Sequence, residues 1–361
     1  DLQVTINDAQ TVITLSASAE VDTSFMGLVG IDTITVSAHA EVTRAVSGLE
    51  LVLVLDNTGF MSGTKLDNLK IAATDLVNIV FGTGDTPDDL YVGLVPFSQA
   101  VNIGTTHSAW MNTTYGGDFD WGPTSWMGCV DARSDGLDVT DDPPSSQLFK
   151  AYYWPDDDNN NWIRYGEYRT PLSTSRGPNK NCPQQVSPLT NTKQTMLDAI
   201  DDMQARGNTH IGLGAAWGWR MLSPRWRGLW GGEMDAKGLP LDYNARRMNK
   251  AAVIMTDGEN TMSNGSHSAY WYLRDGRLGT TSSTDARTAL DTRLERVCTS
   301  MKNKGIVVYT VAFGSPGTSI QNLMRSCASQ ADFYFDSPTN EELQAAFKTI
   351  GDSLSNLRLS R

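Results

Sequence analysis

The feature that most constrains this chain is an uninterrupted apolar run, residues 51–55, that ends in Asp56. A continuous apolar run bounded by turn-forming residues is typical of a strand buried on both faces, as in parallel sheets. A short turn that contains glycine follows, and residues 65–81 then carry a helical pattern. Asp56 is therefore expected at the carboxyl end of a central strand, at the entrance to a helix. In open α/β sheets, ligands bind at that edge.

Two later segments supply further polar groups of the same kind. Residues 250–257 form a second apolar strand that ends in Asp257, and a Gly-rich loop places Thr209 at the start of a helix. Together with Asp56 and Thr58, these side chains offer only oxygen ligands. Such ligands suit a hard divalent cation: Mg²⁺, Mn²⁺ or Ca²⁺. The candidate metal ligands are therefore Asp56, Thr58, Thr209 and Asp257.

Strand and helix patterns alternate over the rest of the main region. Strands are expected at 90–97, 306–313 and 332–335, and helices at 193–205, 211–222, 285–304, 319–328 and 340–357. The ranges 223–249 and 260–284 are expected to be loops. Alternating strands and helices with short links imply an α/β fold with a doubly wound, mostly parallel sheet flanked by helices.

Two regions depart from this alternation. The first is a small N-terminal β layer, with strands expected at 2–6, 11–19 and 33–42, a turn at 7–10 and one helical turn at 25–30. The second is a long insertion rich in Gly, Pro, Asn, Asp and Trp, and a loop region of such length is normally functional or disordered. The expected division is the β layer at 1–48, the main domain at 49–103 and 191–361, and the insertion at 104–190.

The four cysteines lie far apart, and none forms a CxxC pair, which argues against a zinc site. By sequence neighbourhood we pair Cys129 with Cys182, and Cys298 with Cys327. The chain-entropy model values closure of the first loop at roughly 4 kcal/mol, so we expect an ordered, stapled insertion beside the metal edge. Spaced cysteines and many tryptophans indicate an extracytoplasmic protein. Four reduced, buried thiols in a cytoplasmic protein are the alternative.

Charge and hydropathy argue against a nucleic-acid partner and against a membrane-spanning segment in this sequence. The net charge of −12 argues against a nucleic-acid partner, because phosphate binding needs a basic field. No apolar run approaches the roughly 18 residues that span a bilayer, and no signal peptide is evident. The first residues are typical of the middle of a protein, so we expect an upstream segment. The four histidines are scattered, and none pairs with a credible Ser or Cys nucleophile, which argues against a hydrolase triad.

The four candidate ligands resemble the von Willebrand factor A domain and its metal-ion-dependent adhesion site. That family has the pattern Asp-x-Ser/Thr-x-Ser, then a distant Thr and a distant Asp, and Asp56, Thr58, Thr209 and Asp257 match it. Phe60 departs from it, because the family has a serine there. The resemblance implies the von Willebrand factor A fold and a divalent cation whose binding Phe60 weakens or removes. Either water completes a weak site, or the ring acts as an apolar plug and the site stays empty.

Several further segments are similar to one branch of this family, the TadG-type proteins of bacterial tight-adherence (Tad/Flp) pilus systems. They are 126–130, 188–190, 207–211, 216–224 and 357–360, and the Gly-Trp-Arg-Met-Leu-Ser-Pro run is the most specific. The resemblance covers nearly the whole chain and implies a non-enzymatic role in pilus assembly or adhesion. It implies pilus or minor-pilin proteins, or a surface ligand, as partners. It also implies a periplasmic or surface location, anchored by an N-terminal helix that this chain lacks.

Three features also have plainer interpretations. Asp56 could be a helix N-terminal aspartate stabilised by the helix dipole. Residues 156–161 could form a Ca²⁺ loop, but they lack the spaced ligands of an EF-hand, and a solvated loop is favoured. The tryptophans between 110 and 230 could form a sugar- or partner-binding surface, but we favour a buried core for the insertion.

Two other functions compete with the pilus role. The first is a self-assembling surface or filament protein whose β layer, or a missing N-terminus, supplies the contacts between copies. The second is a metal-dependent enzyme, which is disfavoured because no acid–base or nucleophile pair accompanies the carboxylates.

Overall fold

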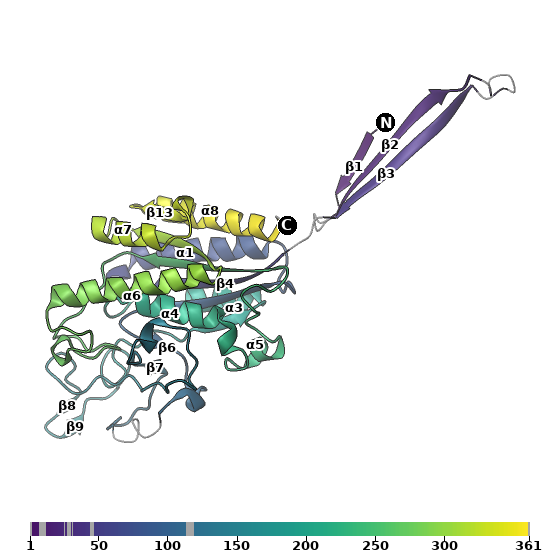
Figure 1. Cartoon of the computed structure of the whole chain (residues 1–361). Coiled ribbons are helices and arrows are strands. Elements are labelled where there is room, and N and C mark those ends of the chain that lie inside the picture. The colour runs from purple at the N-terminus through teal and green to yellow at the C-terminus, as the bar shows by residue number, and fades with distance from the viewer. Residues whose placement is uncertain are drawn as a thin grey trace.

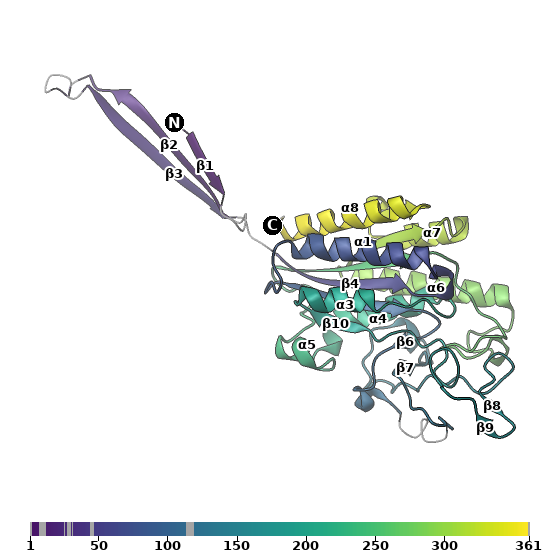
Figure 2. The ribbon, with the colours of Figure 1, turned by 180° about the vertical axis from the view of Figure 1, so that it is seen from behind.

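The computed structural model describes residues 2–6, 12–24, 26, 30, 32–43, 47–112 and 119–359. A three-stranded sheet at the N-terminus projects from a large α/β body, and both views show it standing apart (Figures 1 and 2). The helical turn expected at 25–30 lies largely outside the described residues. In the part of the chain that is described, no helix is long and apolar enough to cross a membrane.

The body is built on a six-stranded sheet in the order β10-β5-β4-β11-β12-β13. Five strands are parallel, and β10 runs antiparallel to β5 at one edge. This arrangement confirms the doubly wound, mostly parallel fold class. The strands are β4 (Gly48–Asp56), β5 (Leu90–Phe97), β10 (Ser187–Thr190), β11 (Met248–Thr256), β12 (Val307–Phe313) and β13 (Tyr334–Ser337).

The strand order reverses between β4 and β11, which lie side by side in the sheet centre. From β4 the chain crosses to β5 on one side, and from β11 it crosses to β12 on the other. A reversal of this kind opens a crevice outside the carboxyl ends of the strands, where doubly wound folds bind ligands. Asp56 ends β4, and Asp257 directly follows β11, so both carboxylates lie at this point.

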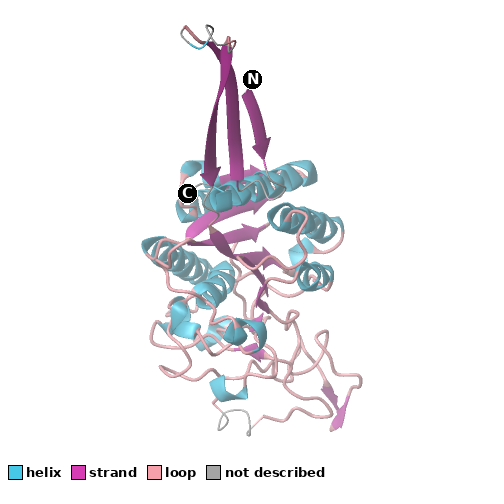
Figure 3. Ribbon diagram, turned by 90° about the vertical axis from the view of Figure 1, so that its right-hand side faces the viewer, coloured by secondary structure: helices cyan, strands magenta, loops and turns pink. Residues whose placement is uncertain are grey.

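Helices cover both faces of the sheet (Figure 3). Alternate side chains of β4 point to opposite faces: Leu51, Leu53 and Leu55 belong to one core, and Val52 and Val54 to the other. Helices α1 (Thr64–Phe81), α3 (Lys193–Asp201) and α8 (Asn340–Leu359) contribute to the leucine core. Helices α4 (Ile211–Leu222), α6 (Ser283–Asn303) and α7 (Thr318–Cys327) contribute to the valine core. The uninterrupted apolar run is therefore buried on both faces, as expected.

Glycines let α4 lie unusually close to the sheet. A Cβ atom added at Gly218 would lie 2.6 Å from the side chain of Val54, and one at Gly214 would lie 2.6 Å from the ring of Phe97. Glycine inside a helix costs roughly 1 kcal/mol relative to alanine. Alanine cannot replace glycine at either position, because α4 lies too close to β4 and β5 to leave room for a Cβ atom.

Four local expectations need correction. Helix α3 ends at Asp201 and not at Ala205, because the chain then turns to bring the backbone N–H of Arg206 to the carbonyl of Asn57 at 2.8 Å. The last strand begins at Tyr334, after a short 3₁₀ turn that begins at Ala331. Strand β10 lies inside the range assigned to the insertion but pairs with the main sheet. The range 223–249, expected to be a loop, contains the short helix α5 (Gly232–Ala236).

The N-terminal sheet consists of β1 (Leu2–Ile6), β2 (Val12–Asp22) and β3 (Thr33–Thr43), paired antiparallel in that order. The three expected strands are confirmed, and β2 extends to Asp22. Apolar side chains on this sheet are exposed, among them Leu2, Val4, Val21, Ile34 and Val36. Globular proteins normally cover an apolar sheet face, so this sheet lacks a partner among the described residues.

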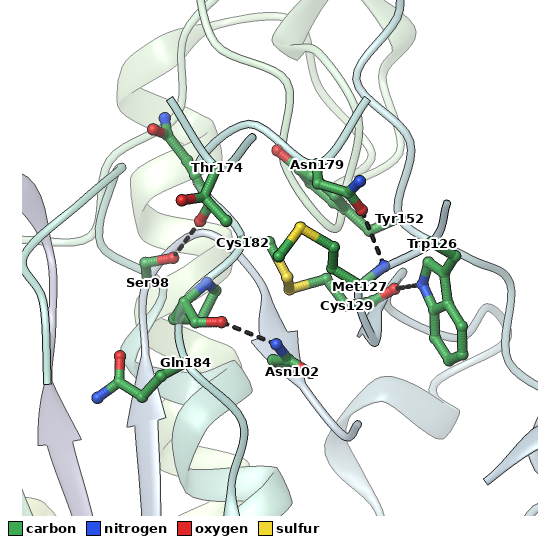
Figure 4. Close-up of a disulfide and its surroundings, with 12 residues drawn as sticks. Ser98, Asn102, Trp126, Met127, Cys129, Tyr152, Thr174, Asn179, Cys182 and Gln184 are labelled. Atoms are coloured by element: carbon green, nitrogen blue, oxygen red, sulfur yellow. Dashed lines mark hydrogen bonds between the residues drawn. A yellow bond between two sulfur atoms is a disulfide. The ribbon is translucent and has the colours of Figure 1, made fainter. Parts of the chain in front are cut away.

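The insertion is ordered by a disulfide and by an aromatic core. Cys129 and Cys182 are bonded, with their Cα atoms 5.8 Å apart, and Cys298 is bonded to Cys327. Both expected pairs are therefore present. Figure 4 shows the first disulfide, where the indole N–H of Trp126 donates to the carbonyl of Cys129. The short strands of this region are β6 (Val101–Asn102), β7 (Cys129–Val130), β8 (Ile163–Arg164) and β9 (Glu167–Tyr168).

Four tryptophans from distant segments form one buried cluster. Trp110 of the insertion packs against Trp226 and Trp230, with ring centroids 5.1 and 5.2 Å apart, and against Trp217 of α4. All four are at most 4% exposed. This confirms the core interpretation for these tryptophans. It also anchors the insertion on α4, since large aromatic rings contribute much of the buried area in a core.

Candidate metal centre

The centre is organised around Asp56, which is completely buried at the end of β4. Its Oδ1 accepts the backbone N–H of Thr58 at 2.9 Å, and its Oδ2 accepts the hydroxyl of Thr256 at 2.7 Å. Burial, and then the neighbouring charge of Asp257, raise the pKa of Asp56 to about 6. A divalent cation bound between Asp56 and Asp257 would relieve this electrostatic cost, because it would balance the charges of both carboxylates.

Asp56 does not act as a helix-capping aspartate. Helix α1 begins at Thr64, and the residue that precedes it is Gly63. The carboxylate of Asp56 instead holds the turn that leads to Thr58 and bonds across to Thr256. Asp56 is therefore not the N-cap residue of α1.

The other candidate ligands are also buried, and each has an unpaired oxygen. Thr58 and Thr209 are fully buried, and Asp257 is 6% exposed. The hydroxyls of both threonines, and Oδ1 of Asp257, have no hydrogen-bond partner among the described residues. Buried polar atoms are nearly always paired in native proteins. Three unpaired oxygens in neighbouring segments are therefore available to coordinate a bound group.

Backbone hydrogen bonds bring the three segments together. The N–H of Gly59 donates to the carbonyl of Gly207 at 2.9 Å, which joins the first loop to the threonine loop. The N–H of Asn208 donates to the side chain of Gln99 at 2.7 Å. Gly207 has a φ of +75°, a conformation that favours glycine. Thr209 in turn is joined to the segment after Asp257, because its carbonyl accepts the N–H of Thr261 at 3.0 Å.

These residues fit a hard divalent cation. The set contains two carboxylates and two hydroxyls, with no nitrogen or sulfur, which is the chemistry that Mg²⁺, Mn²⁺ and Ca²⁺ prefer. Among the described residues, no three His, Cys, Asp or Glu side chains gather where they could hold a metal ion, and half of the ligands proposed here are hydroxyls. The unpaired oxygens of Thr58, Thr209 and Asp257 are what support a cation here.

Lys65 is the site residue that the sequence analysis missed. Its Nζ lies 2.6 Å from Oδ2 of Asp257, and its side chain is 39% exposed. Lys65 is the second residue of α1, where the helix dipole disfavours a positive charge. A lysine at this unfavourable position in the sequence could have indicated that a carboxylate lies nearby. The ammonium group neutralises part of the charge that a cation would otherwise balance.

Phe60 lies in a short 3₁₀ turn, Gly59–Met61, and its side chain is 67% exposed. It lines an open pocket of about 430 Å³ together with Lys65, Asp257 and the glycines of the loop that follows β12. The ring therefore stands at the rim of the centre. The expected alternative in which it seals the site as an apolar plug does not fit this exposure.

The polar segment 156–161 is a structured turn. Oδ1 of Asp157 accepts the backbone N–H groups of Asn159 and Asn160 at 2.8 and 2.7 Å. Oδ1 of Asp156 accepts the N–H of Trp162 at 2.6 Å. These oxygens satisfy the backbone of the turn itself, which agrees with the favoured loop interpretation over a Ca²⁺ loop.

Comparisons with known proteins find solved structures that are similar to this chain. Neither a protein-family model nor a curated protein matches the sequence. The von Willebrand factor domain of the type V pili tip protein Mfa5 from Porphyromonas gingivalis is 10% identical, with a TM-score of 0.47, and the match covers 88% of this chain and 97% of that one. The pilus adhesin SpaC from Lactobacillus rhamnosus GG is 12% identical, with a TM-score of 0.45, over 98% and 34%.

Proximal thread matrix protein 1 from the mussel byssus, solved with a zinc-occupied metal-ion-dependent adhesion site, is 12% identical, with a TM-score of 0.40. The match covers 87% of this chain and 47% of that one. The chain thus spans about a third of SpaC and just under half of the byssus protein.

Proposed function

We propose that this chain is a non-enzymatic, extracytoplasmic component of a bacterial Tad/Flp-type pilus system that acts in pilus assembly or adhesion through a divalent-cation site. The observation that carries the proposal is the set of three buried, unpaired oxygens, on Thr58, Thr209 and Asp257, beside the buried carboxylate of Asp56. The TadG-type segments of the sequence supply the pilus context.

The bound cation would supply a Lewis-acidic contact point on the protein surface. Asp56, Thr58, Thr209 and Asp257 would hold it, and Mg²⁺ usually keeps part of its shell as water when proteins bind it. A carboxylate or carbonyl of a pilus or minor-pilin protein, or of a surface ligand, replaces such a water. The open pocket at Phe60 gives that partner access, and the ring offers an apolar contact next to the cation.

The location is part of the same proposal. Two disulfides are stable in oxidising compartments and rare in the cytoplasm. We infer a periplasmic or cell-surface position, with membrane anchoring through a helix upstream of residue 1. We also propose the four-part division into β layer, split main domain and insertion, with β10 assigned to the main sheet.

Calorimetric titration with Mg²⁺, Mn²⁺ and Ca²⁺ tests the cation site. Thr209→Val, which removes a ligand, and Asp257→Asn, which removes the charge of one, should each weaken binding at least about tenfold, a loss of about 1.4 kcal/mol or more. Thr288→Val is the matched control, because its hydroxyl donates within α6 to the carbonyl of Thr284. Equal affinity in all four proteins would refute the site.

Capture of purified pilin subunits with Mg²⁺, and its loss in EDTA, tests the adhesive role.

A self-assembling filament protein is the second candidate function. The observation that favours it is the N-terminal sheet, whose exposed valine, leucine and isoleucine side chains have no cover among the described residues. Exposed apolar sheets with free edges pair readily with other chains. Electron microscopy of the purified chain distinguishes the two candidates: ordered filaments that disappear in an Ile34→Thr, Val36→Thr variant would support self-assembly.

A further inference from the structure

A second pocket, of about 270 Å³, lies between the insertion and the segment 267–275. It shares no lining residue with the pocket at Phe60. Aromatic side chains form much of its wall: Phe119 and Tyr153 from the insertion, and Trp271 and Tyr272 from the later segment. Pockets of this kind, apolar with a few convergent polar groups, are the usual form of small-ligand sites.

The aromatic wall is fixed in place. The rings of Phe119 and Tyr153 are stacked, with centroids 4.2 Å apart and an interplanar angle of 5°. Tyr272 meets the ring of His267 edge-on at 5.0 Å. Trp271 has a φ of +64°, which is rare for a bulky residue and costs free energy. Strain of this kind persists where the surroundings enforce it, and the indole N–H of Trp271 is held by Asp131 at 2.7 Å.

Two polar residues that line this pocket each carry a buried, unpaired atom. Asp131 is 3% exposed, and while its Oδ2 accepts from Trp271, its Oδ1 has no partner among the described residues. His267 is 5% exposed, and its Nδ1 has no hydrogen-bond partner among the described residues. Burial lowers the pKa of His267 to about 3, so its ring is neutral at pH 7. Oδ1 of Asp131 in its ionised form, and Nδ1 of His267 in the tautomer protonated at Nε2, can accept hydrogen bonds from a ligand that brings hydroxyl groups.

The charges around the pocket narrow the ligand class. Asp275, and Asp131 in its ionised form, disfavour an anion, and Arg274 lines the same pocket, with its guanidinium 4.0 Å from the Tyr272 ring. Arg277 stands 4.6 Å over Trp271 and 3.9 Å from Asp131, where it disfavours a second cation. The remaining class is an uncharged molecule with an apolar face for the rings and hydroxyls for the acceptors.

We propose that this pocket binds one pyranose ring of a carbohydrate. Its C–H face packs on the aromatic wall, one hydroxyl donates to Oδ1 of Asp131, and another donates to Nδ1 of His267. Arg274 donates to a ring or hydroxyl oxygen. This site is separate from the cation centre and does not depend on it.

Saturation-transfer NMR on the full, oxidised chain tests the proposal. The probes are the methyl glycosides of glucose, galactose, mannose, N-acetylglucosamine and N-acetylgalactosamine, each with and without EDTA. We expect transfer to the ring protons of at least one glycoside, unchanged by EDTA. Asp131→Asn keeps an acceptor for Trp271 but loses the unpaired carboxylate oxygen, and it should weaken that glycoside at least about tenfold.

Trp271→Ala should abolish binding, and Phe119→Ser covers the case in which that variant fails to fold, as judged by its melting temperature. Tyr165→Ala is the matched control, because Tyr165 is 91% exposed and does not line the pocket. Its affinity should equal that of the unaltered chain. Absence of transfer to all five glycosides would overturn the proposal. Binding that persists equally in the Asp131→Asn and Phe119→Ser variants would also overturn it.

Discussion

At the scale of single residues, we expect two side chains to control how strongly the candidate centre binds a cation. Phe60 stands at the position where the family pattern has a serine, on a turn next to Thr58. Phe60→Ser should supply a further hydroxyl and tighten cation binding. Anything that binds only the folded state stabilises it, by about 2.7 kcal/mol at a ligand concentration of 100 times Kd.

Thermal melts of both versions with EDTA and with millimolar Mg²⁺ or Mn²⁺ measure this effect. We expect a small shift in Tm for the Phe60 protein and a clearly larger one for the serine version. Equal shifts would show that position 60 does not supply a ligand, and the match of this turn to the family pattern would then be wrong.

Lys65 should act in the opposite sense to a ligand. Its ammonium group lies 2.6 Å from Asp257 and shares the negative charge that a cation needs. Lys65→Met should therefore raise the affinity for Mg²⁺ while lowering Tm in EDTA, because the two carboxylates then repel each other without compensation. Lys348→Met, at an exposed position on α8, is the control. A Lys65→Met protein with unchanged affinity and unchanged Tm would contradict this role.

His267 should make folding stability depend on pH. Burial lowers its folded pKa to about 3, below the unfolded value of about 6.5. Its contribution is complete above pH 6.5 and is lost as pH falls, at about 1.4 kcal/mol per pH unit between these values. Asp131 has the opposite effect on the pH dependence of stability. Burial raises its folded pKa to about 7, so its contribution to stability falls as pH rises towards that value. His267→Gln should therefore reduce the slope of unfolding free energy against pH by about 1.4 kcal/mol per pH unit, measured by urea unfolding between pH 6 and 4.5. Identical slopes would exclude the effect.

At the scale of secondary-structure elements, a buried ion pair joins the two central strands. Glu50 of β4 and Lys250 of β11 are register partners, and both side chains are at most 2% exposed. They are hydrogen-bonded to each other, and Oε1 of Glu50 also accepts the N–H of Leu241 at 2.7 Å. The pair lies toward the amino ends of the strands, away from Asp56, so it serves the sheet and not the cation.

Lys250→Met should destabilise the protein by about 3–5 kcal/mol, because it leaves a buried carboxylate unpaired. The double variant Glu50→Gln, Lys250→Met should recover most of that loss, since replacing both members of a buried pair is often neutral. Chemical denaturation of the three proteins measures both values. A double variant as unstable as the single one would mean that packing, and not charge pairing, dominates at this position.

At the scale of the whole molecule, the insertion depends on one disulfide and on contacts with the body. Arg220 of α4 is 1% exposed and donates to the carbonyls of Thr140, Leu137 and Asp138 at 2.9–3.1 Å. Trp217 from the same helix packs on Trp110 and Phe149 of the insertion. Arg220, inside the specific Gly-Trp-Arg-Met-Leu-Ser-Pro run, and Trp217, directly before it, thus hold the insertion against the body.

Limited proteolysis should leave residues 130–180 intact in the oxidised protein. The Cys129→Ser, Cys182→Ser variant should be cut there faster, since a bridge over a loop of this length is worth roughly 4 kcal/mol in the chain-entropy model. The Cys298→Ser, Cys327→Ser variant is the control, because that disulfide joins α6 to α7 in the body. Rapid cutting throughout 130–180 in the unaltered protein would show that the insertion is not held as the structure shows.

The sequence by itself determined the features that short-range patterns encode. The run 51–55, buried on both faces, and the exact span of α4 follow from local periodicity, which a strand or helix imposes on its own residues. Asp56 and Asp257 were predictable as neighbours because each ends a parallel strand at one sheet edge. The disulfide pairing followed from neighbourhood alone.

Only the tertiary structure decided which groups compete, pair or remain unpaired. The contact of Lys65 with Asp257 joins residues 192 positions apart, and no local pattern carries that information. The antiparallel edge strand β10 was too short to be predicted and exists because β5 offers it a partner. The exposure of Phe60 and the unpaired oxygen of Asp131 likewise depend on packing between distant segments. Side-chain burial is a property of the assembled layers, and the chemistry of both pockets arises there.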